Sequence, residues 1–298
     1  MNAAARGHLA MLCFSGLIAG SFALGSLASP YIGSTAMNAV RFALAAVLLG
    51  IVAQARVGLT GAQFRAPWRF VILGGLMGFY FVTMFEGLKT APPVSLSAVF
   101  TLMPVVAGGF GYILMRQVMT RRMALALSFG GLGALWVIFR ADLNALVAFE
   151  VGRGVAIYFM GCVAHALYAP LVPRLNRGES PIAFSFGALV AATGMILVAG
   201  WGEIRATDWA ALPPIVWITV VYTAAMATAL TFVLLQYATL RLPSAKVMAY
   251  TYLTPVWVIC WLVALGEGLP PLKLLPGVAL ILVALALLLK DEHGSKEA

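Results

Sequence analysis

Charged side chains are scarce in this sequence. Asp, Glu, Lys and Arg make up 10% of the 298 residues, whereas 62% of the residues are hydrophobic and the mean hydropathy is +0.99. A soluble domain carries roughly 25% charged residues. The apolar residues also form blocks that are long enough to cross about 30 Å of hydrocarbon as helices. This composition excludes a water-soluble globular fold and predicts an all-α integral membrane protein.

Groups that bind metals or catalyse reactions inside a membrane are scarce as well. The three cysteines, Cys13, Cys162 and Cys260, each lie inside an apolar block and show no CxxC spacing. We interpret them as core residues and expect no metal site and no cofactor. The sequence has no HExxH motif and no pair of aspartates inside an apolar block. An intramembrane enzyme is therefore disfavoured, while a channel stays open as an alternative.

The apolar blocks predict ten transmembrane helices. Short connectors rich in Pro, Gly and charge separate them, and none of the connectors is long enough to hold a soluble domain. The predicted spans are residues 8–28, 35–55, 68–88, 93–115, 121–140, 151–172, 182–201, 213–239, 244–265 and 271–290.

Basic residues are distributed unevenly between the two sides of these spans. With the N-terminus in the cytoplasm, thirteen Lys and Arg residues fall on the inner side and five on the outer side. Cytoplasmic loops retain Lys and Arg, so we expect both termini in the cytoplasm, an even number of spans and a location in the bacterial inner membrane. The net charge of +9 then reflects topology, and no nucleic-acid partner is expected.

The two halves of the chain repeat each other at an offset of 151 residues. This offset aligns Ser29-Pro30 with Ser180-Pro181, Pro92 with Pro243, and Leu102-x-Pro104-Val105 with Leu253-x-Pro255-Val256. We predict two five-helix repeats, residues 1–145 and residues 146–298. Because each repeat has an odd number of spans, the second enters the membrane inverted relative to the first. Inverted repeats are typical of alternating-access carriers whose substrate site lies near the midplane.

These features resemble the drug/metabolite transporter superfamily, specifically its ten-span EamA-type carriers, over essentially the whole chain. The resemblance rests on the duplication, on Arg41 within Ala39-Val40-Arg41-Phe42, and on the Leu-x-Pro-Val motifs. The sequence departs from the common pattern at Met115-Arg116-Gln117, where a Glu often follows the fourth span. In overall character the chain resembles the bacterial exporters of aromatic and other neutral amino acids. The resemblance implies a central cavity made by spans 1 to 4 and 6 to 9, with spans 5 and 10 peripheral.

An ionisable group inside an apolar block is costly in a bilayer, so each one is a candidate functional residue. Arg41 lies about two turns inside the outer end of its span, and Glu86 lies near the outer end of the span 68–88. We predict an ion pair between them with a role in gating or in binding a carboxylate. The alternative is a purely structural pair, or an arginine whose charged end snorkels to the interface.

His165 is the only histidine away from the ends of the chain, and it lies in the inner half of the span 151–172. We consider it a candidate for substrate binding or proton handling. The alternative is a buried histidine with a satisfied hydrogen bond.

Tyrosines occur in several of the spans that the resemblance places around the cavity. Tyr80, Tyr168 and Tyr252 each offer an apolar face and a hydroxyl, which suits a solute with a large side chain. With His165 and Thr101 they form the predicted substrate-binding set. Packing inside the bundle, or a position in an interfacial belt, is the alternative for most such aromatic residues.

Pro104 and Pro255 occupy equivalent positions in the two halves. A proline inside a helix removes a backbone hydrogen bond, so we expect a kink at each position. Kinks alone and kinks that also line the substrate site are both compatible with the sequence.

The sequence thus predicts an inner-membrane transporter that exports small organic solutes by alternating access, with aromatic or other neutral amino acids as the first choice. Nucleotide sugars, sugar phosphates and cationic drugs are the alternative cargoes. A phosphate cargo needs several cationic groups, for which only Arg41 and Lys246 are candidates, and a lipophilic cation needs a central carboxylate. The expected partners are the solute and the lipid bilayer, and we expect the monomer to function alone.

Overall fold

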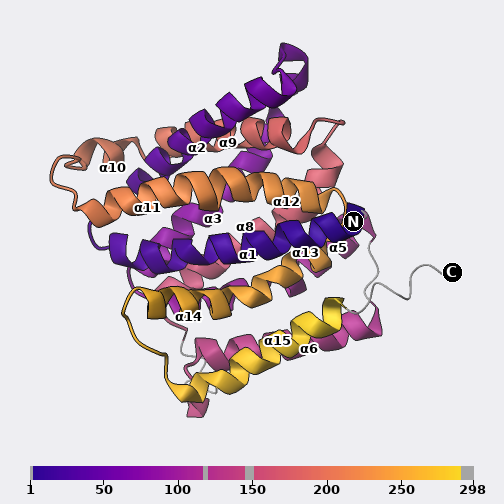
Figure 1. The fold of residues 1–298 in the computed structure, drawn as a ribbon, viewed down its shortest axis with the longest axis vertical. Coiled ribbons are helices and arrows are strands. Elements are labelled where there is room, and N and C mark those ends of the chain that lie inside the picture. Colours follow the sequence, from indigo (N-terminus) through magenta and orange to yellow (C-terminus); the bar gives the residue numbers. More distant parts are fainter. Residues whose placement is uncertain (1–2, 117–119, 145–150, 290–298) are drawn as a thin grey trace.

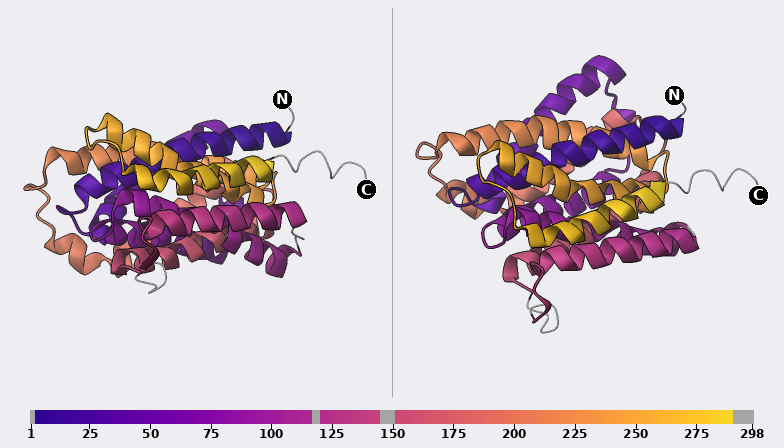
Figure 2. Two further views of the ribbon diagram at one scale, coloured as in Figure 1. Left: turned by 90° about the horizontal axis from the view of Figure 1, so that it is seen from below. Right: turned by 60° about the horizontal axis from the view of Figure 1, so that its bottom comes forward.

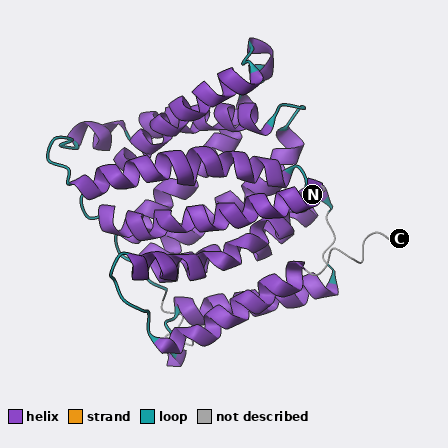
Figure 3. Cartoon of the chain, viewed as in Figure 1, coloured by secondary structure: helices purple, strands orange, loops and turns teal. Residues whose placement is uncertain are grey.

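The computed structural model describes residues 3–116, 120–144 and 151–289, and every regular element within these ranges is a helix (Figure 3). The elements are α1 Ala3–Ala28, α2 Ser34–Val57, η1 Gly61–Phe64, α3 Trp68–Leu88, α4 Pro93–Phe100, α5 Met103–Met115, α6 Arg121–Ile138, α8 Arg153–Leu175, α9 Pro181–Ala199, α10 Trp201–Ala206, α11 Pro214–Ala224, η2 Ala225–Leu230, α12 Thr231–Thr239, α13 Ser244–Ala249, η3 Tyr250–Leu253, α14 Thr254–Ala264, η4 Leu272–Leu274 and α15 Leu275–Leu289.

The predicted spans all correspond to helices. Within the described residues, nine helical segments are long and apolar enough to cross a membrane, and a shorter apolar helix, Leu272–Leu287, occupies the place of the tenth span. The all-α fold class is therefore confirmed. The predicted repeat boundary between residues 145 and 146 lies outside the described residues, as do the residues after 290, which we expect in the cytoplasm.

Three spans are interrupted near their middle. In the fourth span, α4 ends at Phe100 and α5 begins at Met103, with Pro104 in the first turn of α5. In the ninth span, a 3-10 segment, η3, separates α13 from α14, and Pro255 lies in the first turn of α14. In the eighth span, a π-helical segment, η2, joins α11 to α12. The sequence pattern predicted the two proline positions as kinks and did not predict the π-helical segment.

The two halves pack on each other through equivalent pairs of helices. α3 of the first half lies against α8 of the second half. In the equivalent contact, the α11–α12 span of the second half lies against α1 of the first half. α2 pairs with its own equivalent α9, and α6 pairs with α15. In Figure 1 the α2–α9 pair lies at the top of the bundle and the α6–α15 pair at the bottom. Each contact between the halves thus has an equivalent contact in which the two halves have changed places, as a two-fold relation between them requires.

Contacts along α3 and α8 show that the repeat is inverted. Near one end of this pair, a side chain on Gly87 would meet the backbone of Gly154, and at the other end Arg69 donates to the carbonyl of Leu175, so the two helices are antiparallel. The chain reverses direction twice between α1 and α3, so α3 runs parallel to α1. α8, the first helix of the second half, therefore runs opposite to α1. The start of α1 and the end of α15 lie at the same end of the bundle (Figure 1).

The α6–α15 pair lies apart from the centre of the bundle, as the views in Figure 2 show. Gly133 and Gly277 permit its close approach, because a Cβ on either glycine would come within 3.0 Å of the other's carbonyl oxygen. Small residues at such crossings let helix backbones approach in lipid. The peripheral place that the resemblance implied for spans 5 and 10 agrees with this arrangement.

Candidate substrate site

Six aromatic side chains form a closed series of ring contacts between the two halves. We call this set the aromatic circuit. His165 lies 4.4 Å from Tyr80 and 6.2 Å from Tyr168, measured between ring centroids. The remaining ring contacts are Tyr80–Phe81 at 4.7 Å, Phe81–Phe42 at 5.5 Å, Phe42–Phe232 at 6.1 Å and Phe232–Tyr168 at 6.4 Å.

The circuit bridges the two repeats. Phe42, Tyr80 and Phe81 come from α2 and α3, whereas His165, Tyr168 and Phe232 come from α8 and α12. All six side chains are buried. A rearrangement of one half relative to the other would therefore break the Tyr80–His165 and Phe42–Phe232 contacts, which join the halves.

Polar atoms around the circuit are only partly satisfied. Gln236 donates from Nε2 to the Tyr168 hydroxyl at 2.7 Å, and the hydroxyls of Tyr80 and Tyr158 share a hydrogen bond of 3.0 Å. Both ring nitrogens of His165 and the Oε1 atom of Gln236 are buried without a hydrogen-bond partner. A buried polar atom without a partner costs free energy. These buried atoms are therefore the candidate polar groups of the site.

The predicted substrate-binding residues do not all lie together. Tyr80, His165 and Tyr168 meet in the circuit. Tyr252 instead packs with residues of α6 and α15, and its hydroxyl lies where a side chain on Gly130 would be. The hydroxyl of Thr101 donates to the carbonyl of Ala98 one turn earlier, at the break between α4 and α5.

The predicted ion pair between Arg41 and Glu86 is wrong for this structure. Glu86 accepts hydrogen bonds from Lys89 at 2.7 Å and from the Ser34 hydroxyl at 2.9 Å. Arg41 instead donates to Thr228 across the interface with the second half. The cause is the orientation of the helices: the Arg41 side chain packs towards η2, whereas Glu86 lies in the last turn of α3 beside the connector that holds Lys89.

Two residues at the circuit were not predicted as site residues. Gln236 is an amide inside the apolar span 213–239, and its depth in the membrane was a usable signal. Tyr158 lies about two helix turns before His165 on α8 and carries a hydroxyl, so the sequence offered the same signal as for Tyr168. η2 has no comparable signal in a single sequence.

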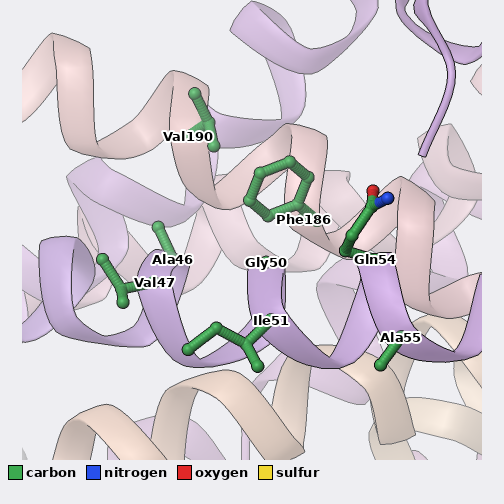
Figure 4. Close-up of a pocket in the computed structure, with 8 residues that line it drawn as sticks. All are labelled: Ala46, Val47, Gly50, Ile51, Gln54, Ala55, Phe186 and Val190. Carbon is green, nitrogen blue, oxygen red and sulfur yellow. The ribbon is translucent and has the colours of Figure 1, made fainter. Parts of the chain in front are cut away.

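An open apolar groove lies apart from the circuit, on the surface between α2 and α9 (Figure 4). It measures about 660 Å³, and its lining includes Ala46, Val47, Ile51, Phe186 and Val190. Gln54 is the only polar side chain in the lining. A surface of this composition suits lipid chains, and it lacks the convergent polar groups of a solute site.

Potential metal ligands do not gather in the described part of the chain. No group of three or more His, Cys, Asp or Glu side chains among the described residues could hold a metal ion.

The described chain is an all-helical bundle built from two inverted halves with polar and aromatic groups between them, and its long apolar helices define a polytopic membrane protein. The chain belongs to the EamA-like transporter family, whose model matches residues 5–139 and 152–290. It is similar to a Bacillus subtilis (strain 168) protein called "uncharacterized transporter YyaM", with 24% identity over 284 residues that cover 94% of this chain and 92% of the relative.

The fold has also been seen in solved structures. One crystal structure matches with a TM-score of 0.71 at 21% sequence identity, covering 96% of this chain and 95% of the other. This likeness shows a shared fold. Together with the family match, it makes the chain a multi-pass membrane transporter.

Proposed function

We propose that this transporter exports neutral amino acids, aromatic ones above all, from the cytoplasm across the bacterial inner membrane by alternating access. The observation that carries the proposal is the placement of His165, with two unpartnered nitrogens, inside a circuit of aromatic rings between the halves. Binding sites for small molecules combine apolar and aromatic walls with a few placed polar groups. A solute with an aromatic side chain and polar backbone groups fits this description.

The charges near the circuit favour this cargo over the alternatives. Arg41 is the one cation in ring contact with a member of the circuit among the described residues. A phosphate or nucleotide-sugar cargo is usually held by several cationic groups. Glu86, the acidic residue nearest in the sequence to Tyr80, is paired with Lys89 in the last turn of α3, so it supports no role as a central counter-ion for a cationic drug.

The topology completes the proposal. We place both termini in the cytoplasm, because the connectors at that end of the bundle carry most of the Lys and Arg residues. The circuit is formed within one chain, which supports the proposal that the monomer transports alone.

Counterflow in proteoliposomes tests the proposal. A carrier shows saturable uptake of labelled phenylalanine that is stimulated by unlabelled phenylalanine on the opposite side, and a pore does not. His165→Ala is expected to lower this exchange about tenfold or more, because it removes the ring and both nitrogens from the circuit. Tyr252→Phe is the matched control and is expected to transport like the wild type. Unsaturable flux, or equal loss in both variants, would overturn the proposal.

A further inference from the structure

Arg41, in the first third of α2, is a fully buried cation. Its side chain has 0% exposure. Nε donates to the hydroxyl of Thr228 at 2.6 Å, and Nη2 donates to the carbonyl of Ala227 at 3.0 Å. The guanidinium carbon lies 3.9 Å from the centroid of the Phe81 ring. Nη1 is buried and has no hydrogen-bond partner.

The π-helical segment η2 creates the site that receives this guanidinium. A π-helical turn inserts a residue into an α-helix, shifts the backbone hydrogen bonds and is frequent at functional positions. Ala227 and Thr228 both belong to η2. Their carbonyl and hydroxyl fix two of the three guanidinium nitrogens in position, and neither carries a charge.

No acidic side chain compensates the charge of Arg41 in the described structure. Within the described ranges, the ion pairs join Arg69 to Glu179 and Lys89 to Glu86. Glu203 accepts hydrogen bonds from the backbone N–H groups of Thr35 and Ala36 at the start of α2. An unpaired charge at membrane depth is expensive and marks a binding or transport path.

Arg41 also adjoins the aromatic circuit. Phe81, whose ring the guanidinium covers, contacts Tyr80 at 4.7 Å, and Tyr80 in turn contacts His165 at 4.4 Å. The rings of Phe81 and Tyr80 therefore connect the guanidinium of Arg41 to the imidazole of His165, and both groups carry buried nitrogens without a hydrogen-bond partner. A solute that spans this region meets a cation at one side and aromatic rings at the other.

We propose that Arg41 is the carboxylate-binding residue of this transporter, and that η2 holds the guanidinium so that Nη1 receives the carboxylate of the cargo. This inference rests on the proposed function and narrows it. The cargo carries one carboxylate beside an aromatic or other apolar group, and its negative charge balances the charge of Arg41. Charge-assisted hydrogen bonds between guanidinium and carboxylate are among the strongest available to a protein.

The test compares pairs of ligands that differ in the carboxylate. Binding of phenylalanine and of phenylalaninamide is measured by scintillation proximity on detergent-purified protein. The wild type is expected to prefer phenylalanine by about tenfold or more, because hydrogen bonds to charged groups are the strong class. Arg41→Gln is expected to abolish this preference and bind both ligands as weakly as the wild type binds the amide.

Further variants separate a binding role from a structural one. Arg41→Lys keeps the charge and is expected to retain part of the preference. Thr228→Val removes the Nε partner and leaves Arg41 in place, so it is expected to reduce the preference severalfold without abolishing it. If Arg41→Gln keeps the wild-type preference, or loses affinity for both ligands in equal proportion, the inference is overturned. If Arg41→Gln does not fold, the preference of Thr228→Val for phenylalanine over phenylalaninamide is the test. A preference equal to that of the wild type contradicts the inference.

A second ligand pair distinguishes failure of this inference from failure of the proposed function. If the wild type binds no amino acid, the amino-acid proposal fails, and benzoate and benzamide then probe the anion site alone. Benzoate binding that Arg41→Gln removes supports a carboxylate site for another class of cargo. Equal binding of benzoate and benzamide, or binding of neither, overturns the carboxylate site as well.

Discussion

The hydroxyls of Tyr80 and Tyr158 share a buried hydrogen bond of 3.0 Å across the α3–α8 interface, which joins the two repeats. Both side chains have 0% exposure. Each hydroxyl loses this hydrogen bond when the other is removed, so Tyr80→Phe and Tyr158→Phe are each expected to destabilise the protein by about 1–2 kcal/mol. The double variant should cost little more than either single one. Unfolding in mixed detergent micelles measures this cycle, and additive losses would contradict the coupling.

A buried ion pair at one end of the bundle predicts acid sensitivity. Arg69 of α3 donates to Glu179, in the connector between α8 and α9, at 2.6 Å, and the two side chains are 2% and 7% exposed. Burial raises the pKa of Glu179, but hydrogen bonds from Arg69 and from the backbone N–H of Arg177 outweigh it, so the pKa lies below its ordinary 4.5.

Because the pKa of Glu179 is lowered in the folded protein, its carboxylate stabilises the fold at pH values above about 4.5. This stabilisation is lost as the pH falls through the pKa of the folded state. We expect the melting temperature of the wild type to fall between pH 5 and pH 3 by more than that of Glu179→Gln. At neutral pH the variant should be less stable by about 2–4 kcal/mol. If the melting temperatures of the two proteins fall by the same amount between pH 5 and pH 3, the Arg69–Glu179 ion pair does not cause the acid sensitivity.

Charge reversal should not restore function at Arg41 and Glu86. The two residues have separate partners, Thr228 and Lys89, so Arg41→Glu with Glu86→Arg places a new charge in each environment. We expect the double variant to transport no better than Arg41→Glu alone, at less than about a tenth of the wild-type rate. Counterflow measures this, and Glu86→Gln is the matched control. Recovery in the double variant would show that the two side chains pair in another conformation of the transport cycle.

The α3–α9 crossing depends on a glycine. A Cβ on Gly74 would lie 2.5 Å from the carbonyl oxygen of Ala188 and 2.6 Å from the nitrogen of Ala192, both backbone atoms that cannot move alone. Gly74→Ala is therefore expected to cost about 1–3 kcal/mol. A Cβ on Gly131 of α6 meets no atom within 4 Å, so Gly131→Ala should be neutral or stabilise by up to about 1 kcal/mol. Melting in detergent compares them, and equal effects would contradict the crossing geometry.

Cysteine labelling tests the proposed orientation. The connector between α2 and α3 lies at the end of the bundle where α1 starts, and the connector between α14 and α15 lies at the opposite end (Figure 1). Thr60 is exposed in the first connector, and Leu269 is 77% exposed in the second. In a variant that lacks the native cysteines, Leu269→Cys should react with an impermeant maleimide in intact cells with a permeable outer membrane. Thr60→Cys should react only after lysis. Labelling of both positions from the same side would contradict the topology.

The helices and their order could be predicted from the sequence because the bilayer leaves a backbone few choices. Every N–H and C=O in lipid needs an internal partner, so an apolar block of about twenty residues has to form a helix. α3, Trp68–Leu88, has the bounds that the apolar block 68–88 indicates. The breaks near Pro104 and Pro255 also follow from local chemistry, since proline lacks the N–H that a continuous helix needs.

The site could be predicted only in part. His165, Tyr80 and Tyr168 stood out because their chemistry is unusual inside apolar blocks. Tyr252 met the same criterion, yet the break between α13 and α14 places it in the contact with α6 and α15. Gln236 was overlooked, although it holds the Tyr168 hydroxyl.

The sequence by itself determined the helices, the inverted repeat and the short set of polar residues that lie at membrane depth. Tertiary structure alone decided which of those residues meet. Arg41 packs towards Thr228 because of the rotation of α2 against the α11–α12 span and because of the π-helical segment between them, and neither is visible in the hydrophobic pattern. Hydropathy indicates that a segment lies in the membrane. Which side of that helix faces the other helices and which side faces lipid depends on how the helices pack.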